Sequence, residues 1–291
     1  MKKLLMIINN HSGLANSKHQ LLDAMEVFCK NGYSITTYLT QGINDAYNYL
    51  KKDKTKYEIV CVFGGDGTLN EVTNGLMSKK EKPMIGYFPS GTTNDFGSNF
   101  NLNLDFKELA ENICKDKYKE FDIGICNDSR YFNYVAAFGA FTDVPYTTNR
   151  QAKKRLGNFA YYLQGLTKLS EIKPIKVKYT VNGKSKTINA IFGIIFSGGR
   201  VAGQQIIPKN KSKINDGKFN ILIVEYVESF LNIPDYIAIL AQQNKYIHKF
   251  NSSEVTLEFE AEVNWDLDGE EAKLDKVVNI KNINKALKIK A

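Results

Sequence analysis

The sequence lacks several features that would assign it to a familiar class. No run of 18 apolar residues occurs in its 291 residues, so the sequence predicts no membrane-spanning helix. The four cysteines contain no C-x-x-C pair and the three histidines are scattered, which argues against disulfides, a zinc site and a histidine-rich metal centre. The apolar run after Lys3 is too short for a signal peptide and no small-residue cleavage site follows it. We therefore expect a cytoplasmic protein with reduced thiols.

Two common nucleotide-binding signatures are also missing. There is no G-x-x-x-x-G-K-[ST] segment, which excludes a Walker-type site, and no G-x-G-x-x-G in the first βα turn, which disfavours a redox dinucleotide. The net charge of +8 suits either nucleic acid or an anionic membrane surface, but no nucleic-acid-binding module is recognisable, so no nucleic-acid partner is expected.

The first 125 residues alternate between apolar strands and amphipathic helices. Expected strands are 3–9, 34–39, 58–63 and 84–88, and expected helices are 17–30, 44–52, 68–77 and 106–114. This alternation predicts βαβ units and a mostly parallel sheet, in a Rossmann-like three-layer α/β domain of residues 1–124 whose sheet the C-terminal tail could rejoin.

Residues 125–291 are predicted to form an antiparallel β domain. The Asn182-Gly183 pair predicts a hairpin turn, and 127–130 predicts another. Expected strands are 121–126, 131–138, 175–181, 184–188, 191–197, 219–224, 255–259, 263–266 and 277–280, with helices at 150–170 and 233–243. No linker of low complexity separates the halves, so we expect them to pack around a cleft.

Three polar turns follow the expected parallel strands, at 9–13, 64–68 and 89–95. Ligands of such sheets bind beyond the carboxyl ends of the strands. The turn Gly64-Gly65-Asp66-Gly67-Thr68 lets main-chain N–H groups approach an anion at a helix N-terminus, which predicts a phosphate site. Asp66 suits that site if it acts through Mg²⁺ or orders the loop. A plain tight turn is the alternative.

Residues 64–72 (Gly-Gly-Asp-Gly-Thr-Leu-Asn-Glu-Val) and 89–96 (Pro-Ser-Gly-Thr-Thr-Asn-Asp-Phe) together resemble the diacylglycerol kinase catalytic-domain family, whose bacterial soluble lipid kinases are closest in size. Further resemblance lies at 9–13, at Thr40, at Phe121-Asp122-Ile123-Gly124, at Ile214-Asn215-Asp216-Gly217 and at Trp265-Asp266-Leu267-Asp268-Gly269-Glu270. The resemblance implies a two-domain fold with a β-sandwich second domain and the nucleotide site in the cleft between the domains.

The resemblance also implies an activity, namely transfer of the γ-phosphate of ATP to the hydroxyl of a lipid such as diacylglycerol. Glu270 would be the general base, with neighbouring Glu271 leaving that assignment open, and Asp66 would be the second catalytic residue. Asp66, Asp95 and Asp122 would form an acidic network. Mg²⁺ would be held by the Asp216 side chain and the carbonyls of Lys213 and Lys218. The implied ATP-binding residues are Asn9, Asn10, His11, Ser12, Gly13, Thr40, Gly64, Gly65, Asp66, Gly67, Thr68, Leu69, Asn70, Glu71 and Thr92.

A membrane lipid substrate implies peripheral contact with an anionic membrane surface. The basic segment 150–155, followed by Phe159, Tyr161, Tyr162, Leu163 and Leu166, suits lipid headgroups or the protein core equally well. Whether the protein forms a homodimer is left open by the sequence. Two other functions also stay open, namely an NAD kinase-like phosphotransferase, which shares the glycine loop, and a non-catalytic nucleotide- or lipid-binding regulator on the same fold.

Overall fold

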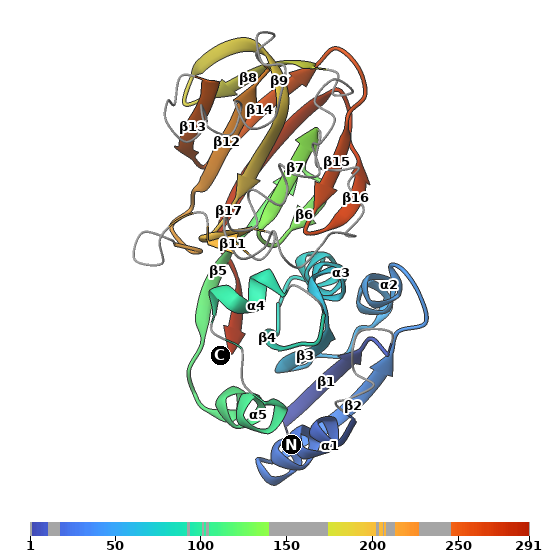
Figure 1. Ribbon diagram of the computed structural model, residues 1–291. Coiled ribbons are helices and arrows are strands. Elements are labelled where there is room, and N and C mark those ends of the chain that lie inside the picture. Colours follow the sequence, from blue (N-terminus) through green and yellow to red (C-terminus); the bar gives the residue numbers. More distant parts are fainter. Residues whose placement is uncertain are drawn as a thin grey trace, which may run out of the picture.

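The computed structural model describes residues 2–10, 18–91, 94–100, 102, 105–139, 174–201, 204–205, 207, 213–226 and 246–290. Figure 1 shows a half built of strands and helices, which carries the N-terminus, and a second half built of strands. The expected fold class is therefore confirmed. The helices expected at 150–170 and 233–243 lie outside the described residues. Among the described residues, no helix combines the length and apolarity needed to cross a bilayer.

The first half is organised on four parallel strands in the order β2-β1-β3-β4. These strands are β1 (Lys2–Ile8), β2 (Tyr33–Leu39), β3 (Ile59–Gly64) and β4 (Met84–Pro89). Every residue of β3 is buried, as is usual for a parallel strand with helices on both faces of its sheet. The loops that leave β1, β3 and β4 at their carboxyl ends therefore start from a rigid base.

Helices cover this sheet in two pairs, which lie on its two sides in Figure 1. Helix α1 (Lys18–Lys30) packs with α5 (Phe106–Cys114), and α2 (Asp45–Lys52) packs with α3 (Asp66–Met77). Helix α5 begins where the Asp105 side chain accepts a hydrogen bond from the Glu108 N–H. A short helix, α4 (Asp95–Asn99), follows the second glycine-containing turn.

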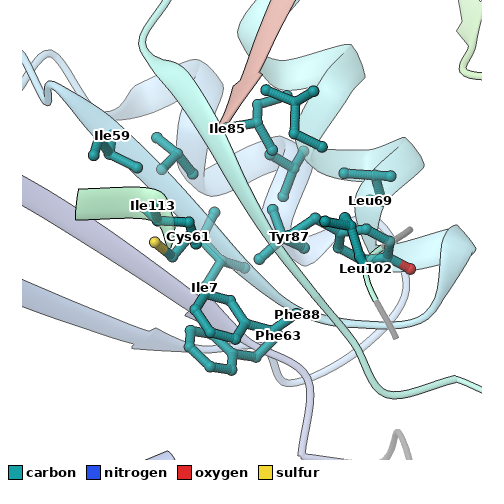
Figure 2. Close-up of a cluster of buried hydrophobic side chains, with 14 of the residues drawn as sticks. Ile7, Ile59, Cys61, Phe63, Leu69, Ile85, Tyr87, Phe88, Leu102 and Ile113 are labelled. Atoms are coloured by element: carbon teal, nitrogen blue, oxygen red, sulfur yellow. The ribbon is translucent and has the colours of Figure 1, made fainter. Parts of the chain in front are cut away.

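The core of this half fixes the ends of β3 and β4. Phe63 and Phe88 stack with their ring centroids 4.0 Å apart, and Phe106 of α5 meets both rings edge-on. Figure 2 shows this cluster, with the labelled side chains Ile7, Ile59, Cys61, Phe63, Leu69, Ile85, Tyr87, Phe88, Leu102 and Ile113. Burial of Phe-sized side chains stabilises by about 1.5–3 kcal/mol each, so the chain enters the glycine loop from a well-held strand.

The second half is antiparallel and encloses its own core, which includes Phe132, Phe219 and Trp265. Its strands are β5 (Lys119–Cys126), β6 (Arg130–Phe132), β7 (Val135–Gly139), β8 (Ile175–Val181), β9 (Lys184–Phe196), β12 (Phe219–Glu225), β13 (Ile247–Ser252), β14 (Glu254–Phe259), β15 (Asn264–Leu267) and β16 (Glu270–Lys273), beside the two-stranded pair β10 (Arg200–Val201) and β11 (Gln204–Gln205). The turn at Asn182-Gly183, with both residues at positive φ, confirms the expected hairpin.

Several strands differ from the expected ones. The strand expected at 131–138 is interrupted at 133–134 and forms two strands, β6, which pairs with β5, and β7, which pairs with β9 and β15. The strands expected at 184–188 and 191–197 form one strand, β9, whose first half pairs with β8 and whose second half pairs with β7 and β12. Strand β13 was not expected, because 247–252 carries little apolar alternation. The strand expected at 277–280 continues to residue 290 as β17 (Val277–Lys290).

Strand β17 joins the two halves. It pairs with β14 near its start, with β5 along most of its length, and with β4 at its end, where Ile289 lies opposite Ile85. Its register shifts between Ile283 and Leu287, where Lys285 has a φ of 51°. The domain boundary at residue 124 stays a prediction.

Candidate active site

Two glycine-containing turns lie against each other at the carboxyl edge of the parallel sheet. Strand β3 ends at Gly64 and α3 starts at Asp66, and the carbonyl oxygen of Gly64 accepts a hydrogen bond of 2.9 Å from the Ser90 N–H. A Cβ atom added to Gly91 would lie 2.7 Å from the Cα atom of Gly65. Backbone approaches backbone here, which only glycine permits.

The turn after β1 joins this edge. The Asn9 side-chain amide donates to the Thr68 hydroxyl at 2.9 Å, and the Asn9 N–H donates to the Phe63 carbonyl oxygen at 2.9 Å. At the end of β2, the N–H and hydroxyl of Thr40 donate to the Ile8 carbonyl oxygen at 3.0 and 3.4 Å. The described parts of the three turns therefore meet, and exposed Asn10 continues the first of them. Four residues of the predicted ATP set lie outside the described residues, namely His11, Ser12, Gly13 and Thr92.

Three side chains of the predicted ATP-binding set make contacts within the protein, away from the phosphate site. Leu69 is fully buried in the core. The Glu71 carboxylate accepts the N–H groups of Asn44 at 2.7 Å and Ala46 at 3.0 Å, so it caps the start of α2. The Asn70 amide is bonded to the second half of the chain. The loop therefore offers an anion its main-chain N–H groups and the positive end of the α3 dipole, rather than these side chains.

Acidic residues gather beneath the glycine loop. The Asp66 carboxylate accepts the Asp95 N–H at 3.1 Å and the Tyr87 hydroxyl at 3.4 Å. Burial, followed by the negative charges of Asp268 and Asp95, raises the pKa of Asp66 to about 7. Asp95 is fully buried, and Arg200 lies beside it, with Nε at 4.0 Å from Oδ1. Among these described residues, negative charge exceeds positive charge, which suits a site that receives a cation together with its ligand.

Asp122, predicted to belong with Asp66 and Asp95, binds a different loop. Its carboxylate accepts the N–H groups of Gly217 and Lys285, both at 2.7 Å, and its own N–H donates to the Ile214 carbonyl oxygen at 2.8 Å. Burial raises the pKa of Asp122, and the charge of Asp216 adds to that effect. Asp122 therefore anchors the loop that contains Asp216.

The Asp216 loop presents oxygen atoms suited to a hard cation. The exposed Asp216 carboxylate accepts the Lys218 N–H at 3.1 Å, and the Lys213 carbonyl oxygen accepts the Gly198 N–H at 3.0 Å. The carboxylate and the carbonyl oxygen can each accept further bonds. Among the described residues, no group of three or more His, Cys, Asp or Glu side chains could hold a metal ion. One carboxylate with main-chain carbonyls fits Mg²⁺, which usually retains several waters.

Glu270 approaches the glycine loop from the second half. Residues Asp268 and Gly269, at φ of 56° and 92°, form a two-residue hairpin turn, and Glu270 follows as the first residue of β16, opposite Leu267. Glu270 is therefore held by strand pairing directly beside the turn. A Cβ atom added to Gly67 would collide with the Glu270 Oε1 atom, so the exposed carboxylate lies on the first turn of α3.

Helix α3 is bonded to the second half by polar side chains that sequence reasoning had not singled out. The Thr73 hydroxyl donates to Asn133 Oδ1 at 2.7 Å. The Asn74 amide donates to the Tyr131 carbonyl oxygen and accepts the Tyr131 N–H, both at 3.0 Å. These bonds hold the helix that starts at the glycine loop against the part of the chain that carries Glu270.

Two further residues were missed. Arg200 comes from the second half and lies beside Asp95, and Asp268 is buried between the halves. No local pattern indicated that the Asp268 side chain would face inward, because its partners are more than 130 residues away.

Comparison with known proteins places this arrangement in a family. The model of the diacylglycerol kinase catalytic domain matches residues 3–126, and that of the YegS C-terminal NAD kinase beta sandwich-like domain matches residues 135–289. A diacylglycerol kinase of Staphylococcus aureus (strain bovine RF122 / ET3-1) is 34% identical over 226 residues, which cover 77% of this chain and 71% of the relative.

Solved structures agree. A crystal structure from Bacillus anthracis strain Sterne, assigned as a diacylglycerol kinase, superposes with a TM-score of 0.80 at 25% identity over 99% of this chain and 95% of its own. A second diacylglycerol kinase structure from that strain has the same fold, with a TM-score of 0.76 at 23% identity over 99% and 96%. The chain belongs to the diacylglycerol kinase catalytic-domain family, the family that its paired motifs at 64–72 and 89–96 resemble.

Proposed function

We propose that this chain is an ATP-dependent lipid kinase that phosphorylates the hydroxyl of a diacylglycerol-like lipid. The observation that carries the proposal is the position of Glu270. A carboxylate from the second half lies on the first turn of α3, beside the main-chain N–H groups of the glycine loop. Phosphoryl transfer needs a phosphate-binding loop and a proton acceptor close to each other, and two different parts of the chain supply them.

On the nucleotide side, the phosphates of ATP bind at residues 64–68. The N–H groups at the start of α3 have no intrahelical partners, and the helix dipole favours negative charge there. The Asn9 amide and the Thr40 backbone border the same edge and would contact the nucleoside side of ATP.

On the acceptor side, Glu270 acts as the general base. It accepts the proton that the lipid hydroxyl loses as its oxygen bonds to phosphorus, a role that contributes about 10²–10⁴-fold to the rate. Glu271 follows it in β16 opposite Asp266, and successive strand residues point to opposite faces. The geometry therefore supports Glu270 over Glu271 as the base.

We also propose Mg²⁺ as the metal. Asp216, with the carbonyls of Lys213 and Lys218, would hold a structural ion beside Asp122. An ion bound with ATP would offset the charge of Asp66 and Asp95, and it would supply electrostatic stabilisation of the phosphoryl oxygens. Without it, Asp66 holds a proton near neutral pH because of its raised pKa of about 7.

The acceptor lipid lies in a bilayer, so the proposal includes peripheral contact with an anionic membrane from the cytoplasm. The net charge of +8 supports this contact, since each basic residue near an anionic surface contributes about 1 kcal/mol. The basic and aromatic stretch 150–166, the best sequence match to such a surface, lies outside the described residues.

The test is a transfer assay with γ-labelled ATP and Mg²⁺, presented separately with diacylglycerol in mixed micelles, a panel of other lipids with free hydroxyls, and NAD. We expect label in a lipid and none after Mg²⁺ is removed by EDTA. Label in NAD would replace the proposal with an NAD kinase-like one, and ATP binding without transfer to any acceptor would favour a regulator.

Glu270→Gln tests the base. We expect a kcat lowered by about 10²–10⁴-fold with the Kd for ATP unchanged, because Glu270 acts on the acceptor proton. Glu271→Gln is the matched control, since it removes an adjacent carboxylate on the other face of β16, and it should keep wild-type turnover. Equal loss in both variants would show that local charge, rather than a placed base, is what matters.

A further inference from the structure

The turn that precedes Glu270 contains a carboxylate that does not face the solvent. Asp268 is the first residue of the two-residue turn between β15 and β16, and its side chain is only 2% exposed. Its φ of 56° is one that Asn, Asp and Gly tolerate best among the amino acids. A turn of this kind needs no buried acid, so the inward-facing carboxylate calls for another explanation.

The Asp268 carboxylate accepts four hydrogen bonds. Its Oδ1 atom accepts the N–H groups of Tyr134 at 2.9 Å and Val135 at 3.1 Å. Its Oδ2 atom accepts the Asn133 N–H at 2.5 Å and the Asn70 side-chain amide at 2.7 Å. Two oxygens with four lone pairs are thereby saturated, and the Asp268 N–H donates to the Val135 carbonyl oxygen at 3.0 Å.

These partners come from both halves of the chain. Residues 133–135 lead into β7 of the second half, whereas Asn70 belongs to α3, the helix that starts at the phosphate-binding loop. Asn70 follows Gly67 by three residues, so the two share one helix face. Glu270 follows Asp268 by two residues and rests on Gly67. One carboxylate therefore connects the glycine-loop helix, the segment before β7 and the turn that carries Glu270.

We propose that Asp268 is a positioning residue, which sets the place of Glu270 relative to the phosphates through its bond to Asn70 of α3. The inference rests on the proposed kinase function and deepens it by assigning what fixes the base. A misplacement of about 1 Å at a reacting group lowers a rate by up to about 10²-fold, so a rigid connection at this point is valuable.

The substitution that isolates this role is Asp268→Asn. Asparagine keeps the size and the positive φ but turns one acceptor oxygen into an NH₂ group, which cannot accept the bonds that Oδ1 or Oδ2 now receives. We expect kcat lowered by about 10²-fold with KM for ATP unchanged. In a Glu270→Gln background the same substitution should lower kcat little further, because Asp268 acts through Glu270.

A matched control separates positioning from a loosened interface. Thr73→Val removes a different buried bond between α3 and the segment before β7, the one to the Asn133 side chain, and leaves in place all four groups that donate to the Asp268 carboxylate. It should leave kcat near wild type. Asn70→Ser serves where Asp268→Asn folds poorly, since it removes the α3 side of the connection and leaves the three main-chain bonds of Asp268. It should lower kcat in the same way.

Hydrogen exchange tests the connection without reference to turnover. In Asp268→Asn, the amides of 133–135 should lose protection together with those of the first turns of α3. Unchanged protection, an equal kcat loss in Thr73→Val, or additive losses with Glu270→Gln would each overturn the inference. Lost protection in a chain whose wild type phosphorylates no lipid would instead refute the kinase proposal and leave the connection established.

Discussion

The raised pKa of Asp66 predicts that one substitution will stabilise the protein and impair its site at once. The carboxylate lies beneath the glycine loop beside Asp268 and Asp95, and burial together with these charges raises its pKa from 3.8 to about 7. Each pKa unit corresponds to about 1.36 kcal/mol, so ionised Asp66 destabilises the ligand-free fold by about 4 kcal/mol above pH 7. Asp66→Asn removes this charge.

The sign follows from proton binding. Below pH 3.8 the carboxyl is protonated in both states and contributes nothing. As the pH rises toward 7, the unfolded chain releases the proton and the folded chain keeps it, so the free energy of unfolding falls with pH. At pH 5 the effect is about 1–2 kcal/mol, and asparagine loses about 1 kcal/mol by offering one acceptor fewer to the Asp95 N–H and the Tyr87 hydroxyl. Asp66→Asn should therefore be near neutral at pH 5 and stabilising by about 3 kcal/mol at pH 8.

Urea unfolding at pH 5 and pH 8, without nucleotide or Mg²⁺, measures both values. The exposed Asp23 of α1 provides the control, because Asp23→Asn removes a carboxylate that has no buried surroundings. A difference in the free energy of unfolding between wild type and Asp66→Asn that is the same at both pH values would show that the fold does not raise the pKa of Asp66. Asp66→Asn should lose transfer activity. That loss would show that the site keeps a carboxylate that destabilises the ligand-free fold because the activity needs it.

Two further predictions concern the frame around the site. Gly91→Ala places a Cβ atom 2.7 Å from the Gly65 Cα atom, and because this contact is with main chain rather than with a flexible side chain, it is relieved only by a shift of the glycine loop. The Kd for ATP, measured by calorimetry, should therefore rise at least about tenfold. An unchanged Kd would show that the loop tolerates displacement. Ile289→Ala empties a fully buried position where β17 pairs with Ile85 of β4, and chemical denaturation should show a loss of about 2–5 kcal/mol, whereas Ile43→Ala, at 88% exposure, should change little.

Local signals predicted most of the first half. The continuous apolar residues of β3 and the glycines after it placed the loop at 64–68, because both features act within a few residues. The Asn182-Gly183 turn was predicted for the same reason. The two turns around Gly65 and Gly91 were expected to meet because parallel strands bring their carboxyl ends to one edge.

The missed features depend on partners far along the chain. Asn70 was expected to contact ATP, but its side-chain amide donates a hydrogen bond to Asp268, 198 residues away. Asp122 was expected beside Asp66, but its carboxylate accepts the N–H groups of Gly217 and Lys285 instead. No local pattern encodes which distant main-chain groups a side chain will meet, so such residues become visible only in the folded chain.

Strand β17 has a consequence for how the protein is made. Its last residues lie beside β4, so the sheet that bears the glycine loop gains this neighbour only after residue 290 has been synthesised, about 200 residues after Ile85. Until then the edge of β4 offers unpaired N–H and C=O groups on the ribosome, and contacts of such long separation form slowly. Completion of the first half therefore depends on the last strand of the second, and a ribosome-bound chain that stops before β17 should bind ATP poorly even though every residue of the glycine loop is present.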